Sequence, residues 1–198
     1  NSLLDIINST TNNVFIPITV GGGIRSIEDV TSALNSGADK VSINTAAIKN
    51  PSLITEISEK FGSQCMVLSI QAKAKSGNWE AYYDNGRESS GLDVIEWAKK
   101  AQDLGVGEIF LTSVDREGTA KGMDIELIKA VTSVVSVPVV ASGGVGSLKD
   151  VELAVKDGGA DAISIAHVLH YEELTINKIR QYCIEKNIPV RKLSEYRA

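Results

Sequence analysis

Short runs of apolar, mostly β-branched residues alternate along this chain with longer stretches in which apolar positions recur every three or four residues. The short runs are almost continuously apolar, as expected of parallel strands covered on both faces. Six strands are predicted, at residues 15–20, 40–44, 65–70, 108–112, 137–141 and 162–166. Helices are predicted between them, at residues 27–35, after Pro51, and at 94–104, 125–134 and 148–156. A strand followed by a helix, repeated along the chain, predicts a parallel α/β fold.

One stretch interrupts this alternation after the third predicted strand. The aromatic-rich residues 79–83 precede Asn85-Gly86, and Asn-Gly is the strongest two-residue signal for a hairpin turn. We therefore predict a hairpin inserted near residues 76–90 of a single domain that spans residues 1–198. Its aromatic side chains either cover a binding site or pack beneath the loop, and the sequence leaves both interpretations open.

An internal repeat decides between an open sheet and a barrel. Residues 16–30 align with residues 137–151, which lie 121 positions later, and both copies contain a proline, a glycine turn and a Ser-x-x-Asp step. Four strands fall within this period, so two periods would make the eight βα units of a (β/α)8 TIM barrel. The chain carries six strands, which predicts an incomplete barrel of this α/β type. Two more units of roughly 30 residues, placed before residue 15, would give the typical barrel size of about 250 residues.

An incomplete barrel leaves its two outermost strands, at residues 15–20 and 162–166, with one neighbour each. Unpaired strand edges invite association with other strands. We therefore expect the open edge to be covered by self-association, by another chain, or by further residues of the same protein.

Composition and charge narrow the classes of function. Apolar residues make up 43% of the chain and charged residues 23%, which is typical of a folded globular domain. A net charge of -5 fits poorly with binding to nucleic acid or an anionic membrane. No apolar run approaches the roughly 20 residues that span a bilayer, and residues 1–5 do not resemble a signal peptide. Two widely separated cysteines, Cys65 and Cys183, favour a reducing compartment, so we expect the cytoplasm.

Two glycine turns follow strands that occupy equivalent places in the repeat. Residues 21–23 end one strand, and residues 142–144 end its repeat partner. Active sites of this fold lie at the carboxyl ends of strands, where glycine lets backbone N–H groups approach an anion. The neighbouring strand ends add Asn44-Thr45 in one half and Ala166-His167 in the other. The duplication favours two phosphate sites over tight turns alone, and predicts a ligand with a phosphate at each end.

Other polar residues at strand ends have two interpretations each. Residues 112–119 are either ligand-facing or a capped surface turn, and Lys73 either binds phosphate or is solvated. Gln71 ends the third strand, but a neutral amide cannot act as a general base. His167 is an anion-binding candidate, whereas His170 is expected to begin a helix or to pack. Two histidines without further ligands predict no metal site, and no cofactor motif is present.

Four segments carry a resemblance to a known family: FIPITVGGGI (15–24), GADKVSINTAAIKNPSLI (37–54), EIFLTSVDREGTAKGMD (108–124) and PVVASGGVGS (138–147). They resemble the cyclase subunit of imidazole glycerol phosphate synthase, a lyase of histidine biosynthesis. The resemblance implies a (β/α)8 barrel, of which this chain would hold the third to eighth strands. It also implies a reaction in which ammonia from a glutaminase partner converts a two-phosphate ribulosyl intermediate into imidazole glycerol phosphate and an aminoimidazole ribotide.

The resemblance assigns roles to residues of this chain. One phosphate site corresponds to Gly23, Asn44 and Thr45. The other corresponds to Gly118, Ser142, Gly143, Gly144, Ala166 and His167. Substrate contacts correspond to Thr112 and Glu117. The charged ring through which ammonia enters corresponds to Lys40 and Glu108, which begin their strands.

Three positions depart from the family pattern. The family's catalytic carboxylates lie on its first and fifth strands; the first lies outside the six predicted here, and Gln71 stands at the Asp of the fifth. Glu117 replaces a shorter Asp, and His167 replaces a phosphate-binding Ser. Loss of one acid/base group lowers a rate by about 10²–10⁴-fold. Two functions therefore stay open: an ammonia-using cyclase, or a non-catalytic or diverged phosphate-binding scaffold, such as a relative from a surface-sugar pathway.

Overall fold

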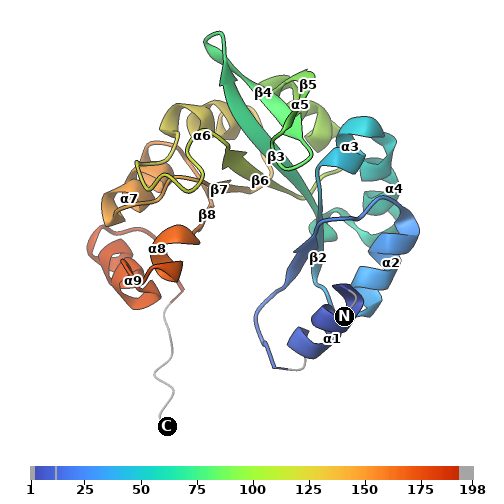
Figure 1. The fold of residues 1–198 in the computed structure, drawn as a ribbon, viewed down its shortest axis with the longest axis horizontal. Helices are drawn as coiled ribbons and strands as arrows, with labels where there is room; N and C mark the ends of the chain where they lie inside the picture. The colour runs from blue at the N-terminus through green and yellow to red at the C-terminus, as the bar shows by residue number, and fades with distance from the viewer. Residues whose placement is uncertain (1–2, 12, 192–198) are drawn as a thin grey trace.

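Six parallel strands form one curled sheet, an open half-barrel, in the computed structural model, which describes residues 3–11 and 13–191 (Figure 1). The strands lie side by side in chain order: β1 (Thr19–Gly21), β2 (Lys40–Ile43), β3 (Met66–Lys75), β6 (Glu108–Ser113), β7 (Val139–Ser142) and β8 (Ala162–Ser164). Every neighbouring pair on this path is parallel. The predicted fold class, an α/β fold of incomplete TIM-barrel type with six strands, is confirmed.

The longer helices cover the convex side of the half-barrel (Figure 1). They are α1 (Leu3–Thr11), α2 (Ile27–Asn35), α4 (Ser52–Phe61), α5 (Val94–Asp103), α6 (Ile125–Thr132), α7 (Leu148–Lys156) and α9 (Ile176–Glu185). Two short helices, α3 (Thr45–Lys49) and α8 (His167–His170), follow β2 and β8, and a 3-10 turn lies at Ser63–Cys65. None of the helices within the described ranges is both long and apolar enough to cross a membrane.

The two faces of the sheet are buried to different extents. On β6, Ile109 and Leu111 face the helices and are fully buried. The alternate residues Glu108, Phe110 and Thr112 are only half-buried. Successive side chains of a strand point to opposite faces, so these three lie on the concave side, which would be the packed interior of a closed barrel.

The internal repeat of the sequence is also a repeat of hydrogen bonds. Asp39 and Asp161 each accept a hydrogen bond from a backbone amide beside the preceding strand, Ile18 at 2.7 Å and Val139 at 2.9 Å. The helices α2 and α7 each begin with a capping box in which a serine and an aspartate three residues later satisfy each other's backbone amides. The two glycine turns are therefore held by equivalent local structures.

The first strand is shorter than the sequence pattern predicts. It was expected over residues 15–20, but β1 begins at Thr19, and Phe15 and Ile16 are 95% and 66% exposed. Pro17 has no backbone N–H to donate, and β1 pairs with β2 alone. Pairing with β2 alone holds only three residues of β1 in a strand. The apolar residues before them lie in the segment that links α1 to the sheet.

The insertion after the third strand is a three-stranded meander. The strand β3 continues to Lys75 and pairs with β4 (Asn78–Tyr83), which pairs with β5 (Glu88–Asp93), both antiparallel. The tightest turn is Ser76-Gly77, whose φ angles of 51° and 85° are both left-handed, as a two-residue hairpin turn requires. Asn85-Gly86, the predicted turn, instead lies within the four-residue link between β4 and β5.

Two buried carboxylates tie peripheral elements together. On α7, Glu152 is 8% exposed and accepts hydrogen bonds from Lys149 at 2.9 Å, from the Tyr182 hydroxyl of α9 at 2.8 Å and from Lys156 at 3.2 Å. These donors, Lys149 first, lower the pKa of Glu152 from an ordinary value of about 4.5 to about 2.

Within the meander, Glu80 is 5% exposed and has an equivalent role. Its carboxylate accepts hydrogen bonds from Lys75, from the Ser89 hydroxyl and from the Gly91 amide. Lys75 and then Ser89 are the main causes that lower the pKa of Glu80 to about 2.

These two glutamates predict acid sensitivity. A carboxyl group whose pKa is lower in the folded state stabilises the fold above its unfolded pKa, and this contribution is lost as pH falls towards the folded value. The urea midpoint should therefore fall between pH 5 and pH 3. We expect Glu152→Gln to lower the midpoint at pH 7 and to reduce the fall. Glu96→Gln is the control, because Glu96 pairs with Lys99 at the surface with 72% of its side chain exposed. An equal fall in wild type and Glu152→Gln would contradict the prediction.

Candidate functional site

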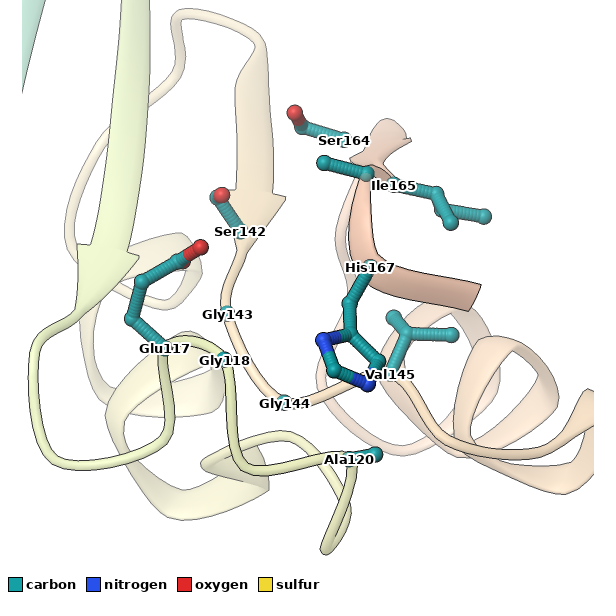
Figure 2. Close-up of a pocket in the computed structure, with 11 residues that line it drawn as sticks. Glu117, Gly118, Ala120, Ser142, Gly143, Gly144, Val145, Ser164, Ile165 and His167 are labelled. Carbon is teal, nitrogen blue, oxygen red and sulfur yellow. The ribbon is translucent and has the colours of Figure 1, made fainter. Parts of the chain in front are cut away.

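Two cavities lie at the carboxyl ends of the strands. The large cavity, of about 1050 Å³, lies over the ends of β1, β2 and β3 and is bordered by the meander. The small cavity, of about 30 Å³, lies between the ends of β6, β7 and β8 (Figure 2).

The residues predicted from the sequence divide between these cavities. The large cavity is lined by Gly23, Asn44, Thr45 and Gln71. The small cavity is lined by Glu117, Gly118, Ser142, Gly143, Gly144, Ala166 and His167. Thr112 lines neither, although it lies in register with Gln71 on one side and Ser142 on the other.

The glycine turn of the small cavity is fixed by its own packing. Gly143 and Gly144 have φ angles of 98° and 96°, which other residues rarely adopt. A Cβ on Gly144 would overlap the carbonyl oxygen of Gly122 and lie 2.9 Å from the Cβ of Arg116. Both glycines are buried, and no group in the described part of the chain accepts a hydrogen bond from either amide. Buried N–H groups are seldom left unpaired, so this turn offers two donors to a ligand.

The glycine turn of the large cavity is more open. Gly22 and Gly23 also have positive φ angles, 93° and 78°, but a Cβ on either would meet nothing within 4 Å. Both are exposed, and residues 3–11 and 13–191 provide no acceptor for their amides. The positive φ angles are enough to explain why glycine occupies these two positions. The free space around them also leaves room for a ligand.

Gln71 is held by its neighbours in the large cavity. The Nδ2 of Asn44 donates to the Oε1 of Gln71 at 3.1 Å and to the carbonyl oxygen of Tyr82 at 3.0 Å. Both N–H groups of the Asn44 amide are thereby used, and its Oδ1 is buried without a hydrogen-bond partner. Gln71 therefore presents a neutral amide with its oxygen already engaged, and Asn44 ties the end of β2 to the meander.

The meander forms part of the wall of the large cavity. The backbone amide of Asp84 donates to the Oγ1 of Thr45 at 3.3 Å, and the Nζ of Lys49 lies 5.5 Å from the centre of the Tyr83 ring. Lys49 and Tyr83 both line the cavity. A cover over a binding site was one of the two interpretations of the aromatic residues, whereas no pattern in the sequence indicated Lys49. The Asn85-Gly86 signal indicated a turn near these residues, but only the path of β4 brings that turn over β2.

The aromatic residues of the insertion have different roles. Tyr83 lines the large cavity, whereas the indole N–H of Trp79 donates to the Oδ2 of Asp124 at 3.0 Å, at the start of α6. Tyr82 lies beneath Lys73, whose Nζ is 5.4 Å from the ring centre. Both interpretations of the insertion therefore apply, each to a different side chain.

An ion pair lies at the opposite end of the strands from the two cavities. The Nζ of Lys40 and the Oε2 of Glu108 are 2.6 Å apart, and the pair bridges from β2 to β6 across β3. Both side chains are partly buried, at 30% and 19% exposure. The two charges beginning otherwise apolar strands are thus paired on the concave side.

The two histidines lie on one short helix. His167 begins α8 and His170 ends it. Of the two expectations for His170, a helix start is therefore wrong and packing is confirmed. Both rings pack against Tyr171, at centroid distances of 4.7 Å and 5.0 Å. Within the described ranges, no three His, Cys, Asp or Glu side chains are grouped so as to hold a metal ion.

The family model described as histidine biosynthesis protein matches residues 1–175. The chain therefore belongs to the histidine biosynthesis protein family, in agreement with the curled parallel sheet and with the resemblance found in its sequence segments.

Proposed function

We propose that this chain is a cyclase-type member of its family, which holds a substrate with a phosphate at each end between its two glycine turns. The observation that carries the proposal is the duplicated turn at the ends of β1 and β7, with amides that have no acceptor in the described structure. Backbone N–H groups at strand ends are common phosphate ligands.

The resemblance narrows the proposed substrate. It points to the two-phosphate ribulosyl intermediate of imidazole glycerol phosphate synthase, with imidazole glycerol phosphate and an aminoimidazole ribotide as products. Gly23 and Thr45 would bind one phosphate, with Asn44 holding the strand end beside them because both of its side-chain N–H groups are already used. The small cavity would bind the other phosphate. Thr112 and Glu117 would contact the substrate between the two phosphate groups.

A glutaminase is the proposed partner. Its ammonia would enter at the amino ends of the strands, where Lys40 and Glu108 form their ion pair. The free edges of β1 and β8 are a second proposed contact surface, because each has only one strand partner in the described sheet. Cys65 and Cys183 are both free and buried, which supports the cytoplasm as the proposed location.

A second candidate function is phosphate binding without turnover. The observation that favours it is Gln71, whose amide stands where the family resemblance expects a catalytic carboxylate. A scaffold or a diverged member of a surface-sugar pathway would keep both anion sites and the partner surface.

Ligand-induced stabilisation tests phosphate binding. We expect millimolar fructose 1,6-bisphosphate, used as a probe with a phosphate at each end, to raise the Tm more than fructose 6-phosphate does. A ligand at 100 times its Kd stabilises the folded state by about 2.7 kcal/mol. Sodium chloride at matched ionic strength is the control, measured by scanning calorimetry. If both sugar phosphates leave the Tm where chloride leaves it, neither turn is a phosphate site.

A further inference from the structure

The small cavity contains two ionisable side chains, and they oppose each other in charge. Of the residues that line it, only Glu117 and His167 can carry a charge; the others are glycine, alanine, serine, valine and isoleucine. In Figure 2, Glu117 projects from the loop after β6 towards Ser142, and His167 projects from the start of α8 towards Gly118 and Gly144.

The Glu117 carboxylate would repel an anion bound in this cavity. A Cβ on Gly143 would lie 3.3 Å from its Oε2, so the carboxylate is close to one of the two unpaired amides. Like charges at such distances repel, more strongly where water is partly excluded. Apart from His167, the lining of this cavity has no basic side chain that could offset the repulsion.

His167 is placed to reverse this balance. No described group makes a hydrogen bond with either of its ring nitrogens, so both remain available to a ligand. The His167 ring packs against the Tyr171 ring, with 4.7 Å between the ring centroids and 52° between the ring planes. The His170 ring also packs against Tyr171, with 5.0 Å between the centroids. Of the side chains near the glycine turn, Arg116, whose Cβ lies beside Gly144, is basic, and Glu117 is acidic. Imidazole is the side chain whose charge changes between about pH 6 and 8.

We propose that protonated His167 is a ligand of the anion in the small cavity, so that binding there strengthens as pH falls from 8 to 6. This inference rests on the proposed phosphate site at Gly143 and Gly144. The large cavity has no histidine in its lining, and its charged residues are Arg25, Lys49, Asp84 and Glu88. Anion binding at Gly22 and Gly23 is therefore independent of pH, and the two sites of one molecule differ in this property.

Inorganic sulfate is the probe that isolates the protein's own titration, because sulfate stays a dianion between pH 6 and 8 whereas phosphate does not. Titrations at pH 6 and pH 8, at constant ionic strength, are followed through the amide ¹⁵N–¹H resonances of Gly22, Gly23, Gly143 and Gly144. A neighbouring opposite charge shifts a protonation equilibrium by about tenfold or more. The Kd at Gly143 and Gly144 should accordingly be about tenfold lower at pH 6, with no change at Gly22 and Gly23.

Three variants identify the residue responsible. His167→Gln keeps a polar side chain but removes the charge, and should equalise the two Kd values near that of wild type at pH 8. Glu117→Gln should lower the Kd at pH 8. His170→Gln is the matched control, because it removes the only other imidazole of the chain. The His170 side chain packs on the same Tyr171 but does not line the cavity. This variant should behave as wild type.

The possible results separate the two proposals. A tenfold pH effect that His167→Gln removes and His170→Gln retains supports the role of His167. Sulfate binding at Gly143 and Gly144 with equal Kd at both pH values overturns that role and leaves the phosphate site standing. Absence of any sulfate-dependent shift at these two amides at either pH overturns the phosphate site, and the role of His167 with it. The Gly22 and Gly23 resonances report in each case whether the variant is folded.

Discussion

Gly144→Ala is expected to destabilise the fold far more than Gly23→Ala, although the two glycines are equivalent in the internal repeat. Both have positive φ angles, 96° and 78°, and alanine in such a conformation costs about 1–3 kcal/mol at either place. Only Gly144 also has a close neighbour, since its Cβ would overlap the Gly122 carbonyl oxygen. The backbone amide of Gly122 also donates a hydrogen bond to the carbonyl oxygen of Gly144 at 2.8 Å, so the two segments cannot easily move apart. Overpacking of this kind typically costs a further 1–3 kcal/mol or so.

Urea unfolding of the two variants measures this difference directly. Gly118→Ala is the matched control on the opposite wall of the small cavity, because Gly118 has a φ of 69° and nothing within 4 Å of a Cβ. It should lose about as much stability as Gly23→Ala. Equal losses for Gly144→Ala and Gly23→Ala would show that the loop after β6 yields easily, and that the small cavity is less rigid than its packing indicates.

The repeat itself explains why so much of the fold was predictable from the sequence. Strands of a parallel sheet are apolar on both faces, and each is followed by an amphipathic helix, so the order of elements appears directly in the hydropathy pattern. The Ser26 and Ser147 capping boxes mark two helix starts that agree with the structure. The weakest predictions were strand ends at the edge of the sheet, where Phe15 is apolar but 95% exposed.

Local signals were less reliable where a contact distant in sequence decides the outcome. Ser76-Gly77 makes the tight turn of the meander and Asn85-Gly86 does not, because pairing of β3 with β4 from Gln71 to Lys75 fixes which residues must turn. The two anion-site candidates were predictable as strand-end glycines. The contact between Lys49 and Tyr83 was not, because the two side chains meet only after the meander folds back over β2.

The positions of the charged residues along the strands were predictable from the sequence, but their contacts were not. The sequence indicates that Lys40 and Glu108 begin their strands, and the structure adds that they reach each other across β3. The family resemblance likewise sets Gly118 and His167 in one phosphate site and Glu117 next to it, but it does not indicate that the Glu117 carboxylate enters the same cavity as His167. That arrangement depends on how far the loop after β6 extends towards β8, which no local pattern encodes.

No measurable cyclase turnover is expected from this chain with the two-phosphate ribulosyl intermediate and ammonium in excess. Excess ammonium removes the need for a glutaminase, so the assay of product formation reports the barrel alone. The physical reason is Gln71, which stands at the position of a family acid and cannot take a proton at neutral pH. Its Oε1 already accepts a hydrogen bond from Asn44 at 3.1 Å, which fixes the amide as a binding group.

Gln71→Asp alone is not expected to restore turnover. The resemblance implies a second catalytic carboxylate on the first strand of the family barrel, and it matches β1, the edge of the described sheet, to the third strand. One missing acid/base group costs about 10²–10⁴-fold, and the second proton transfer would still lack its group. Two βα units added before β1, with an aspartate ending the first strand, combined with Gln71→Asp, are the smallest change expected to recover activity. The same extension with Gln71 retained is the matched control.

Turnover by the unmodified chain, well above the uncatalysed rate, would show that proton transfer does not depend on position 71. Glu117 would then be the next residue to test, because it is the carboxylate nearest to the proposed ligand in the small cavity. Glu117→Gln should in that case abolish the activity, whereas Gln71→Ala should only weaken binding at the large cavity. If instead the extended Gln71→Asp chain is active and its Gln71 control is not, binding and turnover separate at this one position. The second candidate function, phosphate binding without turnover, would then describe the chain as its sequence stands.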